Sequence, residues 1–197
     1  MDKQKTKKVL ISFEDFVKEI TVFHFDEVSS TNDLCKEYAR SGDYEILIVR
    51  ADYQRKGRGR FDRVWLSPPK KNLLFSILVY PRIEAAQTPL LTAVAAQSIA
   101  EVLAKKTKGN ITLKKPNDVL CNGKKIAGIL TEQESIGSRS SFVILGMGIN
   151  INAEKAELPE EATSLRYEED EIFNLDQTFK EVLEAFFKRY QQVMKSR

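Results

Sequence analysis

Apolar residues recur at the spacing of a buried helix face in two parts of the chain. The first part begins at Pro89, a residue favoured at the first position of a helix, and is rich in alanine. The second part covers 176–194, where the apolar stripe consists of Phe179, Val182, Leu183, Phe186, Phe187, Tyr190 and Val193. We therefore predict a long packed helix after Pro89 and another helix over 176–194.

Short runs of apolar and β-branched residues predict strands in the rest of the chain. The predicted strands cover 21–25, 45–53, 73–80, 111–113, 119–121, 125–132 and 141–150. Asn122–Gly123 predicts a tight hairpin turn, and Ser29–Asn32 offers capping side chains for a helix over 33–40. Because strands outnumber helices and hairpins are mixed with strand–helix units, we expect an α/β (α+β) fold with a mixed, largely antiparallel sheet flanked by helices.

The length of 197 residues and a hydrophobic content of 42% favour a single domain with a sizeable core. We expect this domain to cover 21–197, preceded by residues 1–20 as an N-terminal extension or a short amphipathic helix. The 31 Lys and Arg residues nearly balance 28 Asp and Glu residues, which argues against a dedicated DNA-binding protein. Basic residues gather at 55–63 and 114–125, and such short clusters suit phosphate or carboxylate ligands.

The cysteines and the lengths of the apolar runs indicate the cellular compartment of the protein. Cys35 and Cys121 lie far apart and belong to no Cys/His pattern that holds zinc, so we expect reduced thiols. Glu14 and Asp15 interrupt the apolar part of the N-terminus before it could act as a signal peptide. The longest apolar runs are too short to cross a bilayer. These features predict a cytoplasmic protein without a membrane anchor.

The segment Gln54–Arg60 reads Gln-Arg-Lys-Gly-Arg-Gly-Arg. Its glycines free the backbone, and its arginines can bind an anion through two parallel hydrogen bonds. The segment lacks the GxxxxGK[ST] pattern of a Walker A loop. On composition alone it is either a clamp for a phosphate or acyl-phosphate group or an exposed basic turn.

Further motifs favour the clamp. They are Ser-Thr-Asn at 30–32, Lys-Lys-Pro-Asn-Asp at 114–118, Lys-Lys-Ile-Ala-Gly at 124–128 and Gly-Met-Gly-Ile-Asn-Ile-Asn at 146–152. The segment from Gln54 to Trp65, called the basic loop below, belongs to the same series. Together these motifs resemble the biotin–protein ligase family, whose patterns STN, QxxGRGRxGRxW, KWPND, KxxG and GxGINxN occur in the same order. Ala162–Leu165 and the predicted final helix extend the resemblance nearly to the C-terminus.

The resemblance implies the fold of the biotin/lipoate ligase catalytic domain and the activity of a biotin–[acetyl-CoA-carboxylase] ligase. Such an enzyme forms biotinyl-5′-AMP from biotin and ATP, and Mg²⁺ is implied because it bridges ATP phosphates. It then transfers biotin to one lysine of a biotin carboxyl carrier protein. The chemistry brings two anions together, which requires fixed cations.

By the resemblance, Arg58 and Lys125 hold the biotin carboxylate and the adenylate phosphate, while Asp118 either orients Lys125 or helps to deprotonate the acceptor amine. The ureido ring of biotin would meet Ser30, Thr31, Asn32 and Gln54, because a buried polar ring needs paired donors and acceptors. The remaining residues expected to bind biotin or ATP are Gly57, Gly59, Arg60, Arg63, Trp65, Lys114, Asn117, Gly128, Gly148 and Asn150. Among these, Arg60 and Arg63 would close over the phosphates, and Asn117 and Asn150 are candidates for the ATP or metal side. We expect no separate protein metal site.

Several of these residues also have purely structural interpretations. Ser30 and Thr31 could only cap a helix, and Trp65 could be an ordinary core or lid residue. Glycines at 128, 146 and 148 serve either close strand packing or ligand approach. His24, the single histidine, lies in an apolar strand, where a hydrogen-bonded structural role is expected rather than catalysis.

The chain departs from the family pattern at two positions. Lys115 replaces the tryptophan of KWPND and could add phosphate affinity, whereas Asp62 replaces a glycine of the basic loop and would add repulsion. We also expect the chain to lack the family's small SH3-like C-terminal domain and a preceding helix-turn-helix segment, hence to bind no DNA and repress no gene. A homodimer formed edge to edge through the sheet is expected. Two alternatives are a biotin-binding protein without transfer activity and a lipoate–protein ligase or octanoyl transferase.

Overall fold

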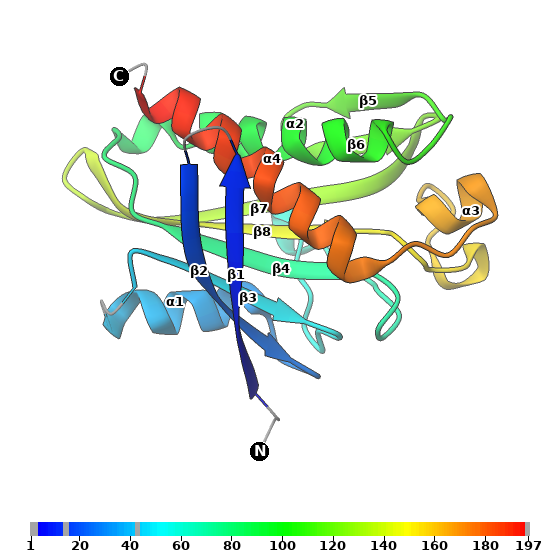
Figure 1. The fold of residues 1–197 in the computed structure, drawn as a ribbon, viewed down its shortest axis with the longest axis horizontal. Helices are drawn as coiled ribbons and strands as arrows, with labels where there is room; N and C mark the ends of the chain where they lie inside the picture. Colours follow the sequence, from blue (N-terminus) through cyan, green and yellow to red (C-terminus); the bar gives the residue numbers. More distant parts are fainter. Residues whose placement is uncertain (1–3, 14–15, 42–43, 196–197) are drawn as a thin grey trace.

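The computed structural model describes residues 4–13, 16–41 and 44–195, and within them the strands form one eight-stranded sheet (Figure 1). The strand order is β1-β2-β3-β4-β8-β7-β6-β5. The strands are β1 Gln4–Phe13, β2 Phe16–Phe25, β3 Ile46–Ala51, β4 Leu73–Val79, β5 Ile111–Lys114, β6 Asp118–Cys121, β7 Lys124–Ile136 and β8 Arg139–Ile149. Only β2 and β3 pair in parallel, so the predicted mixed, largely antiparallel sheet is confirmed for these residues.

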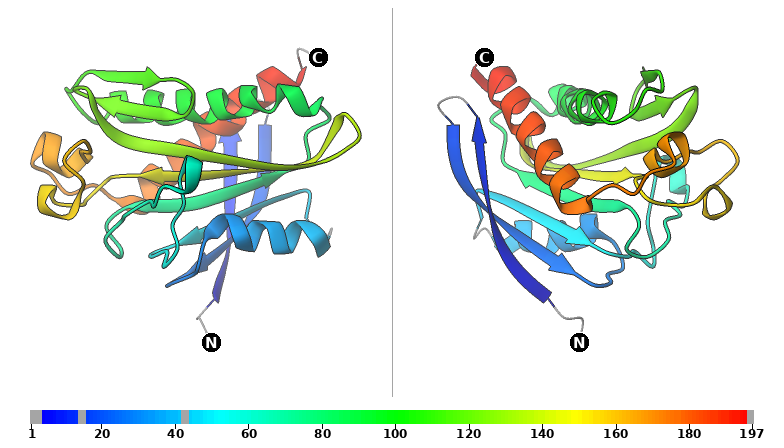
Figure 2. Two further views of the ribbon diagram at one scale, coloured as in Figure 1. Left: turned by 180° about the vertical axis from the view of Figure 1, so that it is seen from behind. Right: turned by 45° about the vertical axis from the view of Figure 1, so that its right-hand side comes forward.

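Helices cover both faces of the sheet. The helix α2 (Pro89–Ala104) begins at the proline, as predicted, and packs beside α4 (Leu175–Lys195) on one face, while α1 (Thr31–Ser41) lies on the other (Figures 1 and 2). The short helix α3 (Leu165–Glu169) stands beyond one end of the sheet. Among the described residues, no helix combines the length and the apolar character needed to cross a membrane.

The two faces of β8 carry different side chains, because successive residues of a strand point to opposite sides. Val143, Leu145, Met147 and Ile149 enter the large core beneath α2 and α4, to which α4 adds its buried stripe. On the other face, Ile144 joins a smaller core beneath α1, but the next positions on that face are Gly146 and Gly148. The α1 face of β8 therefore changes from apolar packing to a surface without side chains.

The N-terminal segment differs from the sequence-based expectation of a helix or a loose extension. Residues 4–13 form the edge strand β1, which pairs with β2 over its whole length, and β2 extends upstream of the predicted 21–25. Ile11 is fully buried, and Val9 packs against the core that α4 completes. Local sequence could not reveal this strand, since the helix that covers it is about 170 positions further along the chain.

The predicted hairpin turn is present between β6 and β7. Asn122 and Gly123 have φ angles of 50° and 80°, the left-handed conformation that such a tight turn requires and that asparagine and glycine tolerate. The turn sets the start of β7, whose first residues include Lys125. A local sequence signal thus fixes the position of a residue expected to be catalytic.

Replacement of Phe186 by alanine tests the core that holds α4 to the sheet. Phe186 is fully buried, so Phe186→Ala should lower the free energy of unfolding by about 3–5 kcal/mol through lost burial and a residual cavity. Urea unfolding followed by circular dichroism measures this. Ile172→Ala is the control, because Ile172 is 72% exposed and its loss should change stability by no more than about 0.5 kcal/mol.

Candidate functional site

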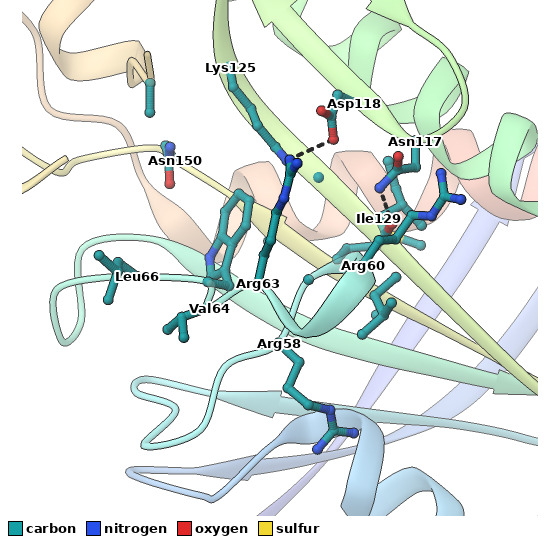
Figure 3. A pocket seen from close by; sticks show the side chains of 18 of the residues that line it. Arg58, Arg60, Arg63, Val64, Leu66, Asn117, Asp118, Lys125, Ile129 and Asn150 are labelled. Atoms are coloured by element: carbon teal, nitrogen blue, oxygen red, sulfur yellow. Dashed lines mark hydrogen bonds and ion pairs between the residues drawn. The ribbon is translucent and has the colours of Figure 1, made fainter. Parts of the chain in front are cut away.

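A cavity of about 470 Å³ opens on the α1 side of the sheet (Figure 3). Its wall comes from the start of α1, the basic loop, the β5–β6 turn, the first half of β7 and the end of β8. Of the predicted site residues, those on the wall are Ser30, Thr31, Asn32, Gln54, Arg58, Gly59, Arg60, Arg63, Trp65, Lys114, Asn117, Asp118, Lys125, Gly128, Gly148 and Asn150. Motifs that are far apart in sequence are thus brought to one place.

Gly57 is the exception, since it does not line the cavity. Its carbonyl accepts a hydrogen bond of 2.9 Å from the Trp65 amide, and a Cβ atom at Gly57 would lie 2.6 Å from the Trp65 carbonyl oxygen. This glycine lets the two ends of the basic loop approach each other. Its contribution to the site is through the loop backbone.

One end of the cavity is a buried polar cluster at the start of α1. Thr31 donates to Gln54 Oε1 from its amide at 2.8 Å and from its hydroxyl at 3.0 Å. The Ser76 hydroxyl lies 2.6 Å from both Thr31 Oγ1 and Asn32 Oδ1. Ser76 is a residue that sequence reasoning missed, because it sits inside the apolar strand β4. The alternation of β4, which places Ser76 on the α1 face opposite Gly146, is the signal that could have found it.

The glycines of β7 and β8 make room for site side chains. A Cβ atom at Gly146 would lie 2.9 Å from Asn32 Cγ, and one at Gly148 would lie 2.6 Å from Trp65 Cζ2. Gly128, directly opposite Gly148 in the sheet, is also in contact with the indole of Trp65. The sequence left two roles open for these glycines, close strand packing or ligand approach. In the structure they leave room for the side chains of Asn32 and Trp65, which form part of the cavity wall.

Lys125 and Asp118 form an ion pair on the cavity wall. Lys125 Nζ lies 2.7 Å from Asp118 Oδ1, and the ammonium group also stands over the ring of Trp65, 5.5 Å from its centre (Figure 3). The backbone of Lys125 is fixed as well, since its amide donates to the Glu161 carbonyl and its carbonyl accepts from the Thr163 amide, each at 2.9 Å. Asp118 is therefore placed to orient the lysine.

Two asparagines expected near ATP or its metal have different surroundings. Asn117 donates from Nδ2 to the Ile129 carbonyl at 2.8 Å, which leaves its Oδ1 atom as an acceptor on the wall. Asn150 is buried, donates to the Thr163 carbonyl at 3.0 Å and accepts from Asn72 at 3.4 Å. The structure thus uses Asn150 to join the end of β8 to neighbouring segments, and its contact with ATP or metal stays a prediction.

The cavity wall carries more basic than acidic side chains. Among the described wall residues, the basic ones are Arg58, Arg60, Arg63, Lys114, Lys115 and Lys125, and the acidic ones are Asp118 and Glu161. Arg58 is paired outside the cavity with Asp33, whose carboxylate raises the pKa of the guanidinium group above its usual range. Arg60 and Arg63 are exposed on the loop between Gly59 and Trp65. The cavity therefore suits an anionic ligand.

The remaining expectations concern residues outside the cavity. His24 lies 2.7 Å from Asp52 through Nε2 and is part-buried between strands, in agreement with a structural role. Both cysteines are free and buried, and burial raises the pKa of each thiol. The described residues contain no group of three or more His, Cys, Asp or Glu side chains that could hold a metal ion.

Residues 24–150 match the model of the biotin/lipoate A/B protein ligase family. The chain belongs to this family. The bifunctional ligase/repressor BirA of Bacillus subtilis is 36% identical over 177 residues, which cover 88% of this chain and 54% of that protein. A biotin–[acetyl-CoA-carboxylase] ligase of Mycobacterium tuberculosis is 34% identical over 145 residues, covering 71% of this chain and 52% of that relative. The chain thus spans about half the length of these relatives.

Solved structures of the family share the fold. The biotin protein ligase of Aquifex aeolicus in complex with biotin and ATP superimposes with a TM-score of 0.71 at 31% identity, over 88% of this chain and 72% of that one. The chain therefore has the fold of a biotin/lipoate ligase catalytic domain, as the sequence motifs predicted. The residue roles carried over from the family motifs remain predictions.

Gly148→Ala tests the seat of Trp65. An added Cβ would collide with the indole, so Trp65 should leave its place over β7 and β8 and become more exposed. Because Trp65 is the single tryptophan, its emission should shift to longer wavelength and be quenched more strongly by acrylamide. Gly59→Ala is the matched control: its Cβ would be 3.4 Å from the nearest atom, the Arg63 carbonyl oxygen, and the emission should stay unchanged. Unaltered emission of Gly148→Ala would contradict the seat.

Proposed function

We propose that the chain is the catalytic part of an ATP-dependent biotin–protein ligase. The observation that carries this proposal is one cavity with a buried polar cluster at one end and the Lys125–Asp118 pair, among further cations, on its wall. Such a cavity suits a ligand with a polar ring at one end and an anionic group at the other. The names of the relatives support biotin as that ligand.

The polar cluster would bind the ureido ring. Gln54 accepts both hydrogen bonds from Thr31 through Oε1, so its Nε2 group remains the donor that a ligand would meet. Ser30 and Thr31 are 4% and 3% exposed, which makes a ligand with unmatched polar atoms costly to bind there. This arrangement favours a buried ring with donors and acceptors of its own.

Lys125 and the basic loop would promote activation. In this step a carboxylate oxygen of biotin attacks the α-phosphorus of ATP, a new O–P bond forms, and pyrophosphate leaves. Fixed cations lower the barrier because negative charge gathers where the two anions meet. Lys125 is suited to this role, since Asp118 and Trp65 hold its ammonium group in place. Arg60, Arg63 and Lys114 would neutralise the remaining phosphate charge.

Mg²⁺ would accompany ATP in this reaction. Magnesium is commonly held by substrate phosphates and one or two protein oxygens, and this donor set fits the Oδ1 atom of Asn117 and the carboxylate of Asp118 on the wall. The ion would supply charge neutralisation to the phosphates. Residues 117 and 118 would position it from the start of β6.

Transfer completes the proposed reaction. The lysine amine of the acceptor attacks the carbonyl carbon of biotinyl-5′-AMP, an amide forms, and AMP leaves as the amine loses a proton. Asp118 is the nearby carboxylate that could assist this proton loss, besides orienting Lys125. We further propose that the acceptor is a biotin carboxyl carrier protein and that the chain forms a homodimer joined at sheet edges. We also propose a cytoplasmic location, which the two free thiols support.

Exchange of labelled pyrophosphate into ATP tests the first half-reaction. The purified chain should catalyse this exchange when biotin is added and not when lipoate replaces it. Exchange with lipoate alone would move the function to a lipoate–protein ligase. Biotin binding without any exchange would indicate a binding protein without ligase activity.

Lys125→Ala should slow biotin-dependent exchange by about 10²–10³-fold, the usual effect of removing one fixed group that stabilises transition-state charge. The unfolding midpoint should change little, because the side chain is part-exposed on the cavity wall. Lys124→Ala is the matched control, since Lys124 is the exposed neighbour in β7 and does not line the cavity. A Lys125→Ala variant that exchanges at the normal rate would move the catalytic cation to another residue.

A further inference from the structure

Arg58 occupies an unexpected position for a ligand of the substrate anion. Its guanidinium group donates two hydrogen bonds to Asp33, at 2.8 Å to Oδ2 and 2.6 Å to Oδ1, and lies 3.6 Å from Glu132. Neither carboxylate lines the cavity. In Figure 3 the side chain of Arg58 points away from Lys125 and Asp118 toward α1. Arg58 itself lines the cavity, but the carboxylate partners of its guanidinium group lie outside it.

The two carboxylates belong to elements that build the polar end of the cavity. Asp33 stands in the first turn of α1, directly after Asn32, and Glu132 lies on β7. Glu132 also accepts a hydrogen bond of 2.6 Å from Asn32 Nδ2. The contacts of Arg58 therefore join the basic loop to α1 and β7, the two elements that carry Asp33 and Glu132.

We propose that Arg58 is a positioning residue, which anchors the basic loop to α1 and β7 so that the following residues, Arg60 and Arg63, face the bound anions. This inference rests on the proposed ligase function and changes one role within it: the resemblance assigns Arg58 to the biotin carboxylate or adenylate phosphate. For that role the guanidinium group would have to leave both carboxylates, although its paired hydrogen bonds to Asp33 match the geometry that arginine prefers.

Asp33→Asn distinguishes an anchor from a ligand of the substrate anion, because it removes the carboxylate charge and leaves every arginine of the sequence unchanged. If Arg58 is an anchor, weakening its partner should free the loop and slow biotin-dependent pyrophosphate exchange by about fivefold, in the range that a partly exposed ion-pair network supports. If Arg58 binds the substrate anion, the same change would release it from a competing carboxylate, and exchange should be as fast as before or faster. The second result would overturn the proposal.

Glu27→Gln is the matched control. Glu27 accepts a hydrogen bond of 2.6 Å from Arg55, another arginine at the start of the same loop, and this pair is similarly exposed. The change therefore removes the same kind of charge close by, but Arg55 does not line the cavity. Exchange by Glu27→Gln should equal that of the unaltered chain. An equal loss in both variants would show a general charge effect and overturn the assignment to Arg58.

The charge exchange Asp33→Arg with Arg58→Asp gives the decisive comparison. An anchor works in either direction, so the double variant should recover part of the activity that each single change loses; recovery is partial because an arginine in the first turn of α1 opposes the helix dipole. A substrate ligand cannot be replaced by an aspartate. A double variant no more active than the worse single variant would overturn the proposal.

Trypsin cleavage after Arg60 and Arg63 measures the loop without any catalysis. Asp33→Asn should be cut about fivefold faster at these sites than the unaltered chain, and the double variant should be cut more slowly than Asp33→Asn. Equal cutting of all variants would overturn the anchor. If the unaltered chain shows no exchange at all, the ligase proposal fails while these cleavage rates still decide the role of Arg58.

Discussion

The site depends on the absence of side chains along one face of β8. Gly146 and Gly148 follow Ile144 on the face toward α1, and Gly128 of β7 stands opposite Gly148. Val143, Leu145, Met147 and Ile149 of the same strand are buried beneath α2 and α4, so the strand cannot shift to fill the space. The space is taken by Asn32 and Trp65, which reach in from α1 and the basic loop. β8 thus packs into the large core with one face and makes room for the cavity wall with the other.

Charge is arranged in pairs around this space. Lys125 is paired with Asp118 inside the cavity, and Arg58 is paired with Asp33 outside it. Asp118 and the ring of Trp65 hold the ammonium group of Lys125 in one place, 2.7 Å from Asp118 Oδ1 and 5.5 Å from the ring centre. Within the part of the chain that the structure describes, Arg60, Arg63, Lys114 and Lys115 are exposed and form no ion pair with a carboxylate. Two basic residues of the described wall, Lys125 and Arg58, are therefore each held by a carboxylate.

Local patterns in the sequence were sufficient for most elements but not for their contacts. The periodicity after Pro89 and over 176–194, and the Asn122–Gly123 turn, depend on nearest neighbours along the chain and are confirmed. The edge strand β1 could not be predicted, because Ile11 is buried only when α4 arrives from the other end of the chain. All the site residues that the motifs predicted, except Gly57, line the cavity. They could not show that Arg58 turns to Asp33 or that Ser76 supports Thr31, since both contacts form between segments without a shared motif.

The basic loop is held at two points and exposed between them. At one end Arg58 contacts α1, and at the other Trp65 rests on the glycines of β7 and β8. Between these points Phe61 is 80% exposed and adopts a left-handed φ of 55°, which a residue with a large side chain seldom does without support. Arg60, Phe61, Arg63 and Val64 are exposed, so few buried contacts hold their side chains in place. A segment that is fixed at both ends and weakly held in the middle can carry Arg60 and Arg63 toward an anion while the polar cluster and Lys125 keep their places.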